Sequence, residues 1–296
     1  MIQFISNLLH TTLQMAAPLI FAAMGGIITE RANLINIGLE GMMLGGAFTG
    51  AITSFAVGNS FVGVLGGMLG GVILAALFAV VVLELKANIV IVGLGLSTLA
   101  TGLTAYLLPT VFGVRGSFAP EGMQSLPKVT IPIIKDIPLL GQILSGFNPL
   151  VYLSWALIPA TSILLYKTVF GRHIRAVGEF EEAARSVGIN VKFVQYSAIL
   201  IDGALCGLAG THLSLGVLAQ FTENMTAGRG WMALAAYFFG AVQPALTALA
   251  SFLFGLFDAL QIRLQSFGVP PQLIQIIPYL AVVLSLTFVD IQRKRA

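Results

Sequence analysis

Long apolar stretches, separated by short polar or glycine- and proline-containing segments, run along the whole chain. A membrane-spanning helix needs about 20 consecutive, predominantly apolar residues. Stretches of suitable length lie at 8–29, 36–58, 61–84, 88–110, 150–169, 192–217, 231–262 and 272–290. The pattern therefore predicts an all-α, polytopic membrane protein.

The stretch 231–262 is too long for a single crossing, because an α-helix rises about 1.5 Å per residue. Gln243 and Pro244 interrupt it, and a proline inside a helix removes a backbone donor and clashes with the preceding turn. We therefore expect a short, re-entrant segment at 231–242, followed by a full helix at 244–262. The whole chain, 1–296, is predicted to be a single transmembrane domain with about eight crossings.

Composition leads to the same class of protein. Hydrophobic residues make up 57% and charged residues 9% of the 296 positions, and the mean hydropathy is +0.95. Soluble domains carry about 25% charged residues, so this chain cannot cover a water-soluble surface and the lipid bilayer is its expected solvent. The net charge of +3 does not indicate a nucleic-acid partner, because most Lys and Arg lie in short loops, as in inner-membrane proteins.

The distribution of Lys and Arg predicts the orientation, since these residues are enriched in cytoplasmic loops. Placing the segment 167–192 and the C-terminal IQRKRA in the cytoplasm puts the N-terminus outside. The proline- and glycine-rich loop 111–149 is then external, where it closes over the outer mouth, lies on the membrane surface or acts as a structural cap. Ten of the fifteen Lys and Arg residues fall inside: Arg31, Lys86, Lys167, Arg172, Arg175, Arg185, Lys192, Arg293, Lys294 and Arg295.

The glycine-rich segment 29–50 contains a carboxylate, Glu40, in an apolar environment. Charged side chains within the hydrocarbon are costly and usually face a bundle interior or an aqueous path. Transporter helices are often discontinuous near the midplane, so Glu40 is a candidate for lining a translocation path. The alternatives are that it caps a backbone turn or pairs with Arg31.

Three further polar residues on predicted helices can hydrogen-bond a sugar or a base. Each can equally serve interhelical hydrogen bonding. With Glu40, the candidates for the path of a small polar solute are Asn36, Asn88 and Ser97.

The predicted cytoplasmic loop 170–191, FGRHIRAVGEFEEAARSVGINV, is charged but also carries small apolar residues. We expect one short helix from about 180 to 187, ended on its two sides by Gly178 and Gly188. A short helix of this kind can dock in a groove on a partner protein, whereas a bare charge run is more often a solvated loop.

The sequence GRHIRAVGEFEEAARSVGI resembles the coupling loop of ABC importer permeases of the branched-chain amino acid, simple-sugar and nucleoside group. It matches the pattern G-x-x-I-R-A-V-G-E-x-x-x-A-A-x-x-x-G-I. In that family the loop contacts the cytoplasmic ATPase. The resemblance implies this contact for Arg175, Gly178, Glu179, Ala183, Ala184 and Gly188.

Further matches are collinear and cover about residues 10–292; the stretch 29–48 is most similar to the nucleoside branch. Three positions depart from the pattern. Asp202 stands where a small residue is expected, GAVQP at 240–244 replaces G-x-W-x-P, and Ser97-Thr98 stands where the nucleoside branch often has Asn. The last departure weakens the substrate assignment.

The resemblance implies a permease subunit in a prokaryotic plasma (inner) membrane that moves nucleosides inward, with ATP hydrolysed by a separate subunit. It implies as partners the ATPase, a second related permease in a heterodimer, and an extracytoplasmic substrate-binding protein. The chain itself has no phosphate loop and no H-E-x-x-H motif, so we expect neither catalysis nor a metal or cofactor.

Other functions remain open at this level. The same family also includes importers of simple sugars and of branched-chain amino acids. From a different class, a stand-alone secondary transporter would use intramembrane carboxylates, for which Glu40 and Asp202 are available. A third class is a non-transporting membrane scaffold.

A short internal similarity links 36–48 with 224–241. In each segment a charged residue precedes a glycine, Glu40 before Gly41 and Arg229 before Gly230, and small residues follow. Inverted repeats leave weak similarities of this kind, although chance produces them equally in a chain rich in Gly and Ala.

Overall fold

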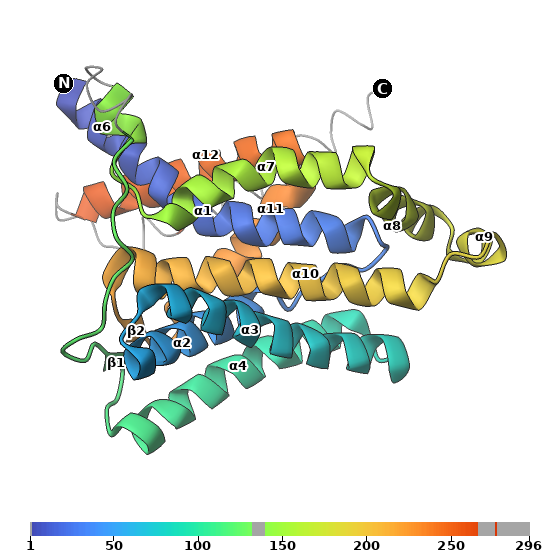
Figure 1. Ribbon diagram of the computed structural model, residues 1–296, viewed down its shortest axis with the longest axis horizontal. Coiled ribbons are helices and arrows are strands. Elements are labelled where there is room, and N and C mark those ends of the chain that lie inside the picture. The colour runs from blue at the N-terminus through green and yellow to red at the C-terminus, as the bar shows by residue number, and fades with distance from the viewer. Residues whose placement is uncertain (1, 132–139, 266–275, 277–296) are drawn as a thin grey trace.

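The computed structural model describes residues 2–131 and 140–265, together with residue 276. Most of the long helices run side by side along the longest axis, and α4 diverges from the others (Figure 1). The helices are α1 (Ile2–Glu30), α2 (Leu39–Val57), α3 (Ser60–Ala79), α4 (Ile89–Phe112), α6 (Leu140–Leu144), α7 (Pro149–Lys167), α8 (Val169–Glu179), α9 (Glu181–Ser186), α10 (Val191–Thr211), α11 (Arg229–Phe239) and α12 (Pro244–Gln265). Two π-helical turns, η1 (Val80–Glu84) and η2 (His212–Leu218), extend α3 and α10.

The predicted all-α class is confirmed, and the described helices follow the predicted spans closely. Within the described ranges, six helices are long and apolar enough to cross a membrane. The predicted interruption before Pro244 is also confirmed, because α11 ends at Phe239 and α12 begins at Pro244. The predicted span 272–290 and the C-terminal IQRKRA lie outside the described residues, so the count of eight crossings stays a prediction.

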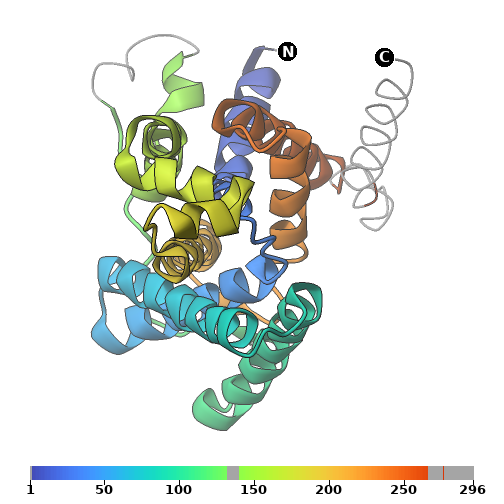
Figure 2. The ribbon, with the colours of Figure 1, turned by 90° about the vertical axis from the view of Figure 1, so that its right-hand side faces the viewer.

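Two helices form the centre of the bundle. In α1 and α10 the most apolar window is 83% buried, compared with 22% in α4. The end-on view shows α4 projecting from one side of the bundle (Figure 2). The helices α1 and α10 therefore lie inside, and α4, which has no charged residue, lies at the edge.

Glycines allow α2, α3 and α10 to pack backbone against backbone. A Cβ at Gly46 would overlap the backbone of Gly207, and a Cβ at Gly207 would overlap the carbonyl of Gly67. A Cβ at Gly203 would likewise fall against the carbonyl oxygen of Gly71. Small residues at such crossings let membrane helices approach closely enough for dispersion contacts to hold them together.

The two ends of the bundle differ. At one end β1 (Ser117–Phe118) pairs antiparallel with β2 (Phe221–Thr222), which ties the segment after α4 to the segment after η2 (Figure 1). The opposite end carries α8, α9 and the turn between η1 and α4. The described Lys and Arg residues that are predicted to be cytoplasmic lie on or beside that second end, as the predicted orientation requires. Which end faces the cytoplasm stays a prediction.

The predicted cytoplasmic loop contains two helices. The expected short helix at about 180–187 is confirmed as α9, but the expected boundary at Gly178 is wrong, because a second helix, α8, runs through that residue. Gly178 lies inside α8, and the break falls at Phe180, whose backbone is extended (φ −157°, ψ 100°). The Thr168 hydroxyl accepts a hydrogen bond from the Gly171 amide and caps α8. The other predicted boundary is confirmed, since Gly188 follows α9 with a φ of +86°.

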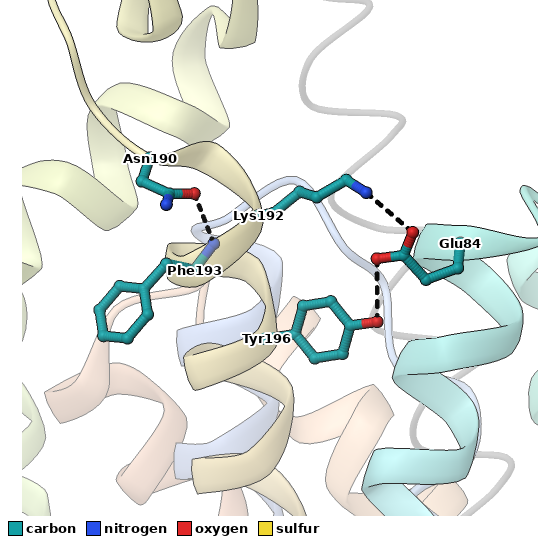
Figure 3. Close-up of polar contacts among 5 residues, drawn as sticks. All are labelled: Glu84, Asn190, Lys192, Phe193 and Tyr196. Atoms are coloured by element: carbon teal, nitrogen blue, oxygen red, sulfur yellow. Dashed lines mark hydrogen bonds and ion pairs between the residues drawn. The ribbon is translucent and has the colours of Figure 1, made fainter.

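A polar cluster joins the end of η1 to the start of α10 (Figure 3). The Glu84 carboxylate accepts from Lys192 Nζ at 2.8 Å and from the Tyr196 hydroxyl at 3.2 Å, while Asn190 caps α10 by accepting from the Phe193 amide at 3.1 Å. Exposed ion pairs contribute little to stability. The cluster therefore links two helix ends without adding much to the stability of the bundle.

Candidate functional site

The first turns of α2 and α11 meet in the interior of the bundle. Gly38 and Gly228 are the N-cap residues of these helices, and Gly228 has a φ of +82°. A Cβ at Gly230 would overlap the backbone nitrogen of Glu40. Two helix N-termini, each with amides that have no partner within their own helix and with a partial positive charge, therefore lie in direct contact.

The Glu40 carboxylate lies where the partial positive charges of the two helix N-termini favour a negative group. Its Oε1 accepts from the Thr226 hydroxyl at 2.6 Å and from the Gly228 amide at 2.9 Å, and its Oε2 accepts from the Gly230 amide at 2.6 Å. The residue is 8% exposed. Of the roles considered for Glu40, this geometry matches the capping of a backbone turn, and the capped turn is the first turn of α11. Arg31 points elsewhere and donates from Nη2 to the Val242 carbonyl at 2.9 Å.

Asn36 connects the start of α2 to the middle of α10. Its Nδ2 donates to Asp202 Oδ2 at 2.7 Å, and its Oδ1 accepts from the Gly38 amide at 2.8 Å. The Thr29 hydroxyl and the Cys206 thiol lie 3.5 Å from the two oxygens of the same carboxylate. Asn36 and Asp202 are both fully buried, so this hydrogen bond is shielded from water.

Arg229, the first residue of α11, connects the meeting point to α12. Its Nη2 lies 3.2 Å from Asp258 Oδ2, with the two side chains 20% and 8% exposed. Its Nη1 donates to the Thr226 carbonyl at 3.3 Å. We name the resulting group the polar centre: Asn36, Glu40, Asp202, Thr226, Arg229 and Asp258.

Sequence reasoning did not place Thr226 or Asp258 among the site residues. Thr226 gave no signal, because a threonine in a polar loop is ordinary. Asp258 did give one: a carboxylate inside the predicted span 244–262 is as unusual as Glu40 in its own span. Asp202 was recognised as a departure from the family pattern and as an available intramembrane carboxylate, but it was not placed among the path residues.

The structure brings three of the four candidate path residues together. Asn36 and Glu40 belong to the polar centre, and Ser97 lies beside it, because a Cβ at Gly41 would be 2.8 Å from Ser97 Cα. Asn88 lies elsewhere: it is exposed and caps the start of α4 by accepting from the amides of Val90 and Ile91. Contact between any of the four and a solute stays a prediction.

The length of α11 fits the expected short segment at 231–242. Its 11 residues extend over about 16 Å at 1.5 Å per residue, roughly half of the 30 Å hydrocarbon core. A helix that begins inside the bundle and is too short to cross it agrees with the discontinuous elements common in transporters. The start of α11 lies beside the start of α2, and these two helix starts belong to the two segments, 224–241 and 36–48, that the internal similarity links.

The predicted cytoplasmic loop 170–191, which contains most of α8 and all of α9 and is called the α8–α9 loop from here on, is a second candidate site. It is anchored on the end of α1. Ile174, Val177 and Ala184 are buried, and a Cβ at Gly178 would overlap the carbonyl oxygen of Arg31. On its outer side Phe180 is 60% exposed. The loop thus holds a fixed position on the bundle while presenting an apolar side chain outward.

The candidate coupling residues differ in accessibility. Glu179, Ala183 and Gly188 are exposed, Ala184 is buried, and Gly178 is partly buried. The guanidinium of Arg175 lies 5.3 Å from the centre of the Tyr166 ring. The exposed part of the set is therefore accessible to a partner, and the rest is buried or partly buried.

Two hollows flank Gly178 and Glu179 on this surface. The first, of about 470 Å³, reaches the end of α1, and the second, of about 410 Å³, reaches the α1–α2 connection at Asn33. The lining residues of the first are Glu30, Arg31, Tyr166, Arg175, Gly178 and Glu179. The α1–α2 connection is therefore part of the same surface as the α8–α9 loop.

Comparison with known proteins agrees with these features. Residues 8–286 match the family described as "Branched-chain amino acid transport system / permease component". The guanosine ABC transporter permease protein NupQ of Bacillus subtilis is 33% identical over 97% of this chain and 92% of its own length. The "Putative glucose ABC transporter permease protein TsgC13" of Haloferax volcanii is 38% identical over 90% of this chain and 80% of its own.

A similar solved structure is described as "An inward-facing conformation of a putative metal-chelate type ABC transporter". It aligns over 95% of this chain and 84% of its own with a TM-score of 0.51 and 18% identity. At this identity the likeness establishes the fold alone. Among the described residues no three His, Cys, Asp or Glu side chains gather in a way that would hold a metal ion.

Proposed function

This chain belongs to the family of branched-chain amino acid transport system permease components, and from that premise we propose that it imports nucleosides. As an ABC permease subunit it is a non-catalytic, multi-pass protein of the prokaryotic inner membrane. Such a subunit works with an ATPase and with a substrate-binding protein. The stand-alone secondary transporter and the scaffold are thereby set aside.

The similarity to two nucleoside permeases carries the choice of substrate. Besides the guanosine permease, the nucleoside ABC transporter permease protein NupC of Lactococcus lactis is 31% identical over 92% of this chain. The stretch 29–48, which supplies Asn36 and Glu40 to the polar centre, is also most similar to the nucleoside branch. The 38% identity to the glucose-named protein of Haloferax volcanii favours a simple sugar as the second candidate.

The candidate path residues are proposed to act in two ways. Ser97 is partly exposed on α4 and Asn88 is exposed at the cap of that helix, so their polar groups can meet a solute directly. Asn36 and Glu40 are buried, so they shape the path by holding the start of α2 and the start of α11. A second related permease would complete the path in a heterodimer.

A substrate screen tests this proposal. The chain is assembled with its ATPase, binding protein and partner permease in liposomes, and ATP hydrolysis is measured with guanosine, other nucleosides, glucose and leucine. We expect nucleosides to stimulate hydrolysis. Stimulation by glucose alone would move the assignment to the second candidate, and failure of the chain to retain any ATPase subunit would contradict the ABC proposal itself.

The α8–α9 loop is proposed to dock the ATPase through Arg175, Gly178, Glu179, Ala183, Ala184 and Gly188. The exposure of Phe180 between the two helices supports this proposal, because buried aromatic anchors dominate many interfaces.

We expect Phe180→Ser and Glu179→Lys to weaken retention of the ATPase roughly tenfold or more, since loss of an interface hot spot costs about 2 kcal/mol. Retention is measured by pull-down of the detergent-solubilised complex. The matched control is Phe193→Ser, because Phe193 is 63% exposed at the same end of the molecule but lies outside the loop. Equal retention in all three variants would exclude the loop as the docking site.

A further inference from the structure

The α1–α2 connection, residues 31–38, is held at both of its ends. At the first end the Arg31 carbonyl lies directly against Gly178 of α8, with no side chain between the two backbones. At the other end Asn36 is bonded to Asp202 of α10, and its own Oδ1 accepts from the Gly38 amide that begins α2. The connection therefore links the proposed docking loop to the polar centre.

The Asp202 carboxylate has an unusual environment for a charged group inside a membrane protein. It is fully buried, and its hydrogen-bond partners are neutral: the Asn36 amide, with longer contacts to Thr29 and Cys206. A buried carboxyl group without a hydrogen-bond partner is costly, so the 2.7 Å bond to Asn36 strongly favours one position of that side chain. Fixing Asn36 also fixes the amide of Gly38, the N-cap residue of α2.

Movement of the start of α2 would not stay local. Glu40, in the first turn of α2, accepts the hydrogen bonds of the Gly228 and Gly230 amides of α11. The starts of α2 and α11 are thus joined to each other through one carboxylate. A displacement that reaches Gly38 is passed to α11 through the same turn.

We propose that Asn36 and Asp202 are positioning residues that couple ATPase docking on the α8–α9 loop to the starts of α2 and α11. This proposal rests on the proposed function. When the docked loop moves, Gly178 displaces Arg31. The Asn36–Asp202 hydrogen bond makes the displacement reorient the start of α2 instead of being absorbed within the connection.

The positioning role needs the hydrogen bond and not the charge, which separates it from a proton-carrying role for Asp202. An amide at position 202 still offers an oxygen to Asn36 Nδ2, whereas a leucine of similar size offers nothing. Exchanging the two residue types also preserves the bond: in Asn36→Asp/Asp202→Asn the new amide donates to the new carboxylate, which can still accept from the Gly38 amide.

The experiment uses the complete transporter in liposomes and measures the ratio of substrate-stimulated to basal ATP hydrolysis, with ATPase retention measured in parallel. Because Asp202→Leu removes a buried hydrogen bond, we expect it to lower the ratio about tenfold while the ATPase stays bound. Asp202→Asn should stay within about twofold of the unmodified protein. Asn36→Asp alone places two carboxyl groups together and should lower the ratio, and the exchanged double variant should restore it.

The matched control is Thr29→Val, which removes the 3.5 Å contact to Asp202 together with the intrahelical bond from the Thr29 hydroxyl to the Gly26 carbonyl, and leaves the bond from Asn36 to Asp202. It should leave the ratio unchanged. The positioning role is overturned if Asp202→Leu couples normally, if Asp202→Asn loses as much as Asp202→Leu, or if the exchanged variant fails to recover. Normal coupling in all variants of a complex that retains its ATPase rejects this inference alone, whereas an unmodified chain that binds no ATPase rejects the proposed function with it.

Discussion

Replacing Glu40 with alanine is expected to destabilise the protein more than any other single polar substitution in the described bundle. The change removes three hydrogen bonds to one carboxylate, from Thr226, Gly228 and Gly230. Hydrogen bonds to charged groups contribute about 1.5–3 kcal/mol each, and unpaired amides inside a bilayer cost several kcal/mol. We therefore expect a loss of about 4 kcal/mol or more, measured as a lower Tm in detergent.

The variant Glu40→Gln gives a graded control for this prediction. Its amide oxygen can still accept from Thr226 and Gly228, but its amino group then faces the Gly230 amide, so the loss should be about half as large. Glu182→Ala controls for general loss of a carboxylate, because Glu182 is exposed on α9. If Glu40→Ala and Glu182→Ala have the same Tm, Glu40 does not stabilise the start of α11.

Adding a single methyl group at Gly207 is expected to prevent the normal packing of α2, α3 and α10. The new Cβ of Gly207→Ala would overlap the carbonyl of Gly67 and approach Met68 Cα, and these are backbone atoms that cannot rotate away. Overpacking of a well-packed core typically costs 1–3 kcal/mol. Because the added methyl group forces two helix backbones apart, we expect about 3 kcal/mol, and a larger loss for Gly207→Leu.

The chain offers a control of opposite sign in α4. A Cβ at Gly95 or Gly102 meets no atom within 4 Å, and alanine favours a helix by about 1 kcal/mol over glycine. Gly95→Ala should therefore leave the Tm of the purified chain unchanged or raise it. Equal thermal stability of Gly207→Ala and Gly95→Ala would show that the close crossing at Gly207 does not support the fold.

The same contacts bear on the choice among the roles considered for the intramembrane acids. The Glu40 carboxylate is occupied by α11, and the Asp202 carboxylate by Asn36. Both acids therefore have a positional use in the described conformation. This agrees with a permease driven by a separate ATPase, which needs no titrating carboxylate of its own.

The sequence alone determined which parts of the chain form the long apolar helices. The apolar lengths predicted the spans from α1 to α12, and Pro244 marked the break between α11 and α12. These features are readable because hydrophobic length and the missing amide of proline act within one segment. The break at Phe180 was missed because it depends on packing between segments. The burial of Ile174 and Val177 against the rest of the bundle, together with the Thr168 cap, lets α8 continue through Gly178.

Only the tertiary structure decided what the polar residues do. Sequence marked Glu40 as unusual, but its partners lie 186 to 190 positions away, and Asn36 and Asp202 are 166 positions apart. It also grouped Asn88 with these residues, although Asn88 caps the start of α4 at the surface. Hydrophobic length specifies each helix separately, whereas partners across the bundle depend on how closely the helices cross. That distance is set here by glycine contacts such as Gly46 with Gly207, which become visible only once the helices are packed.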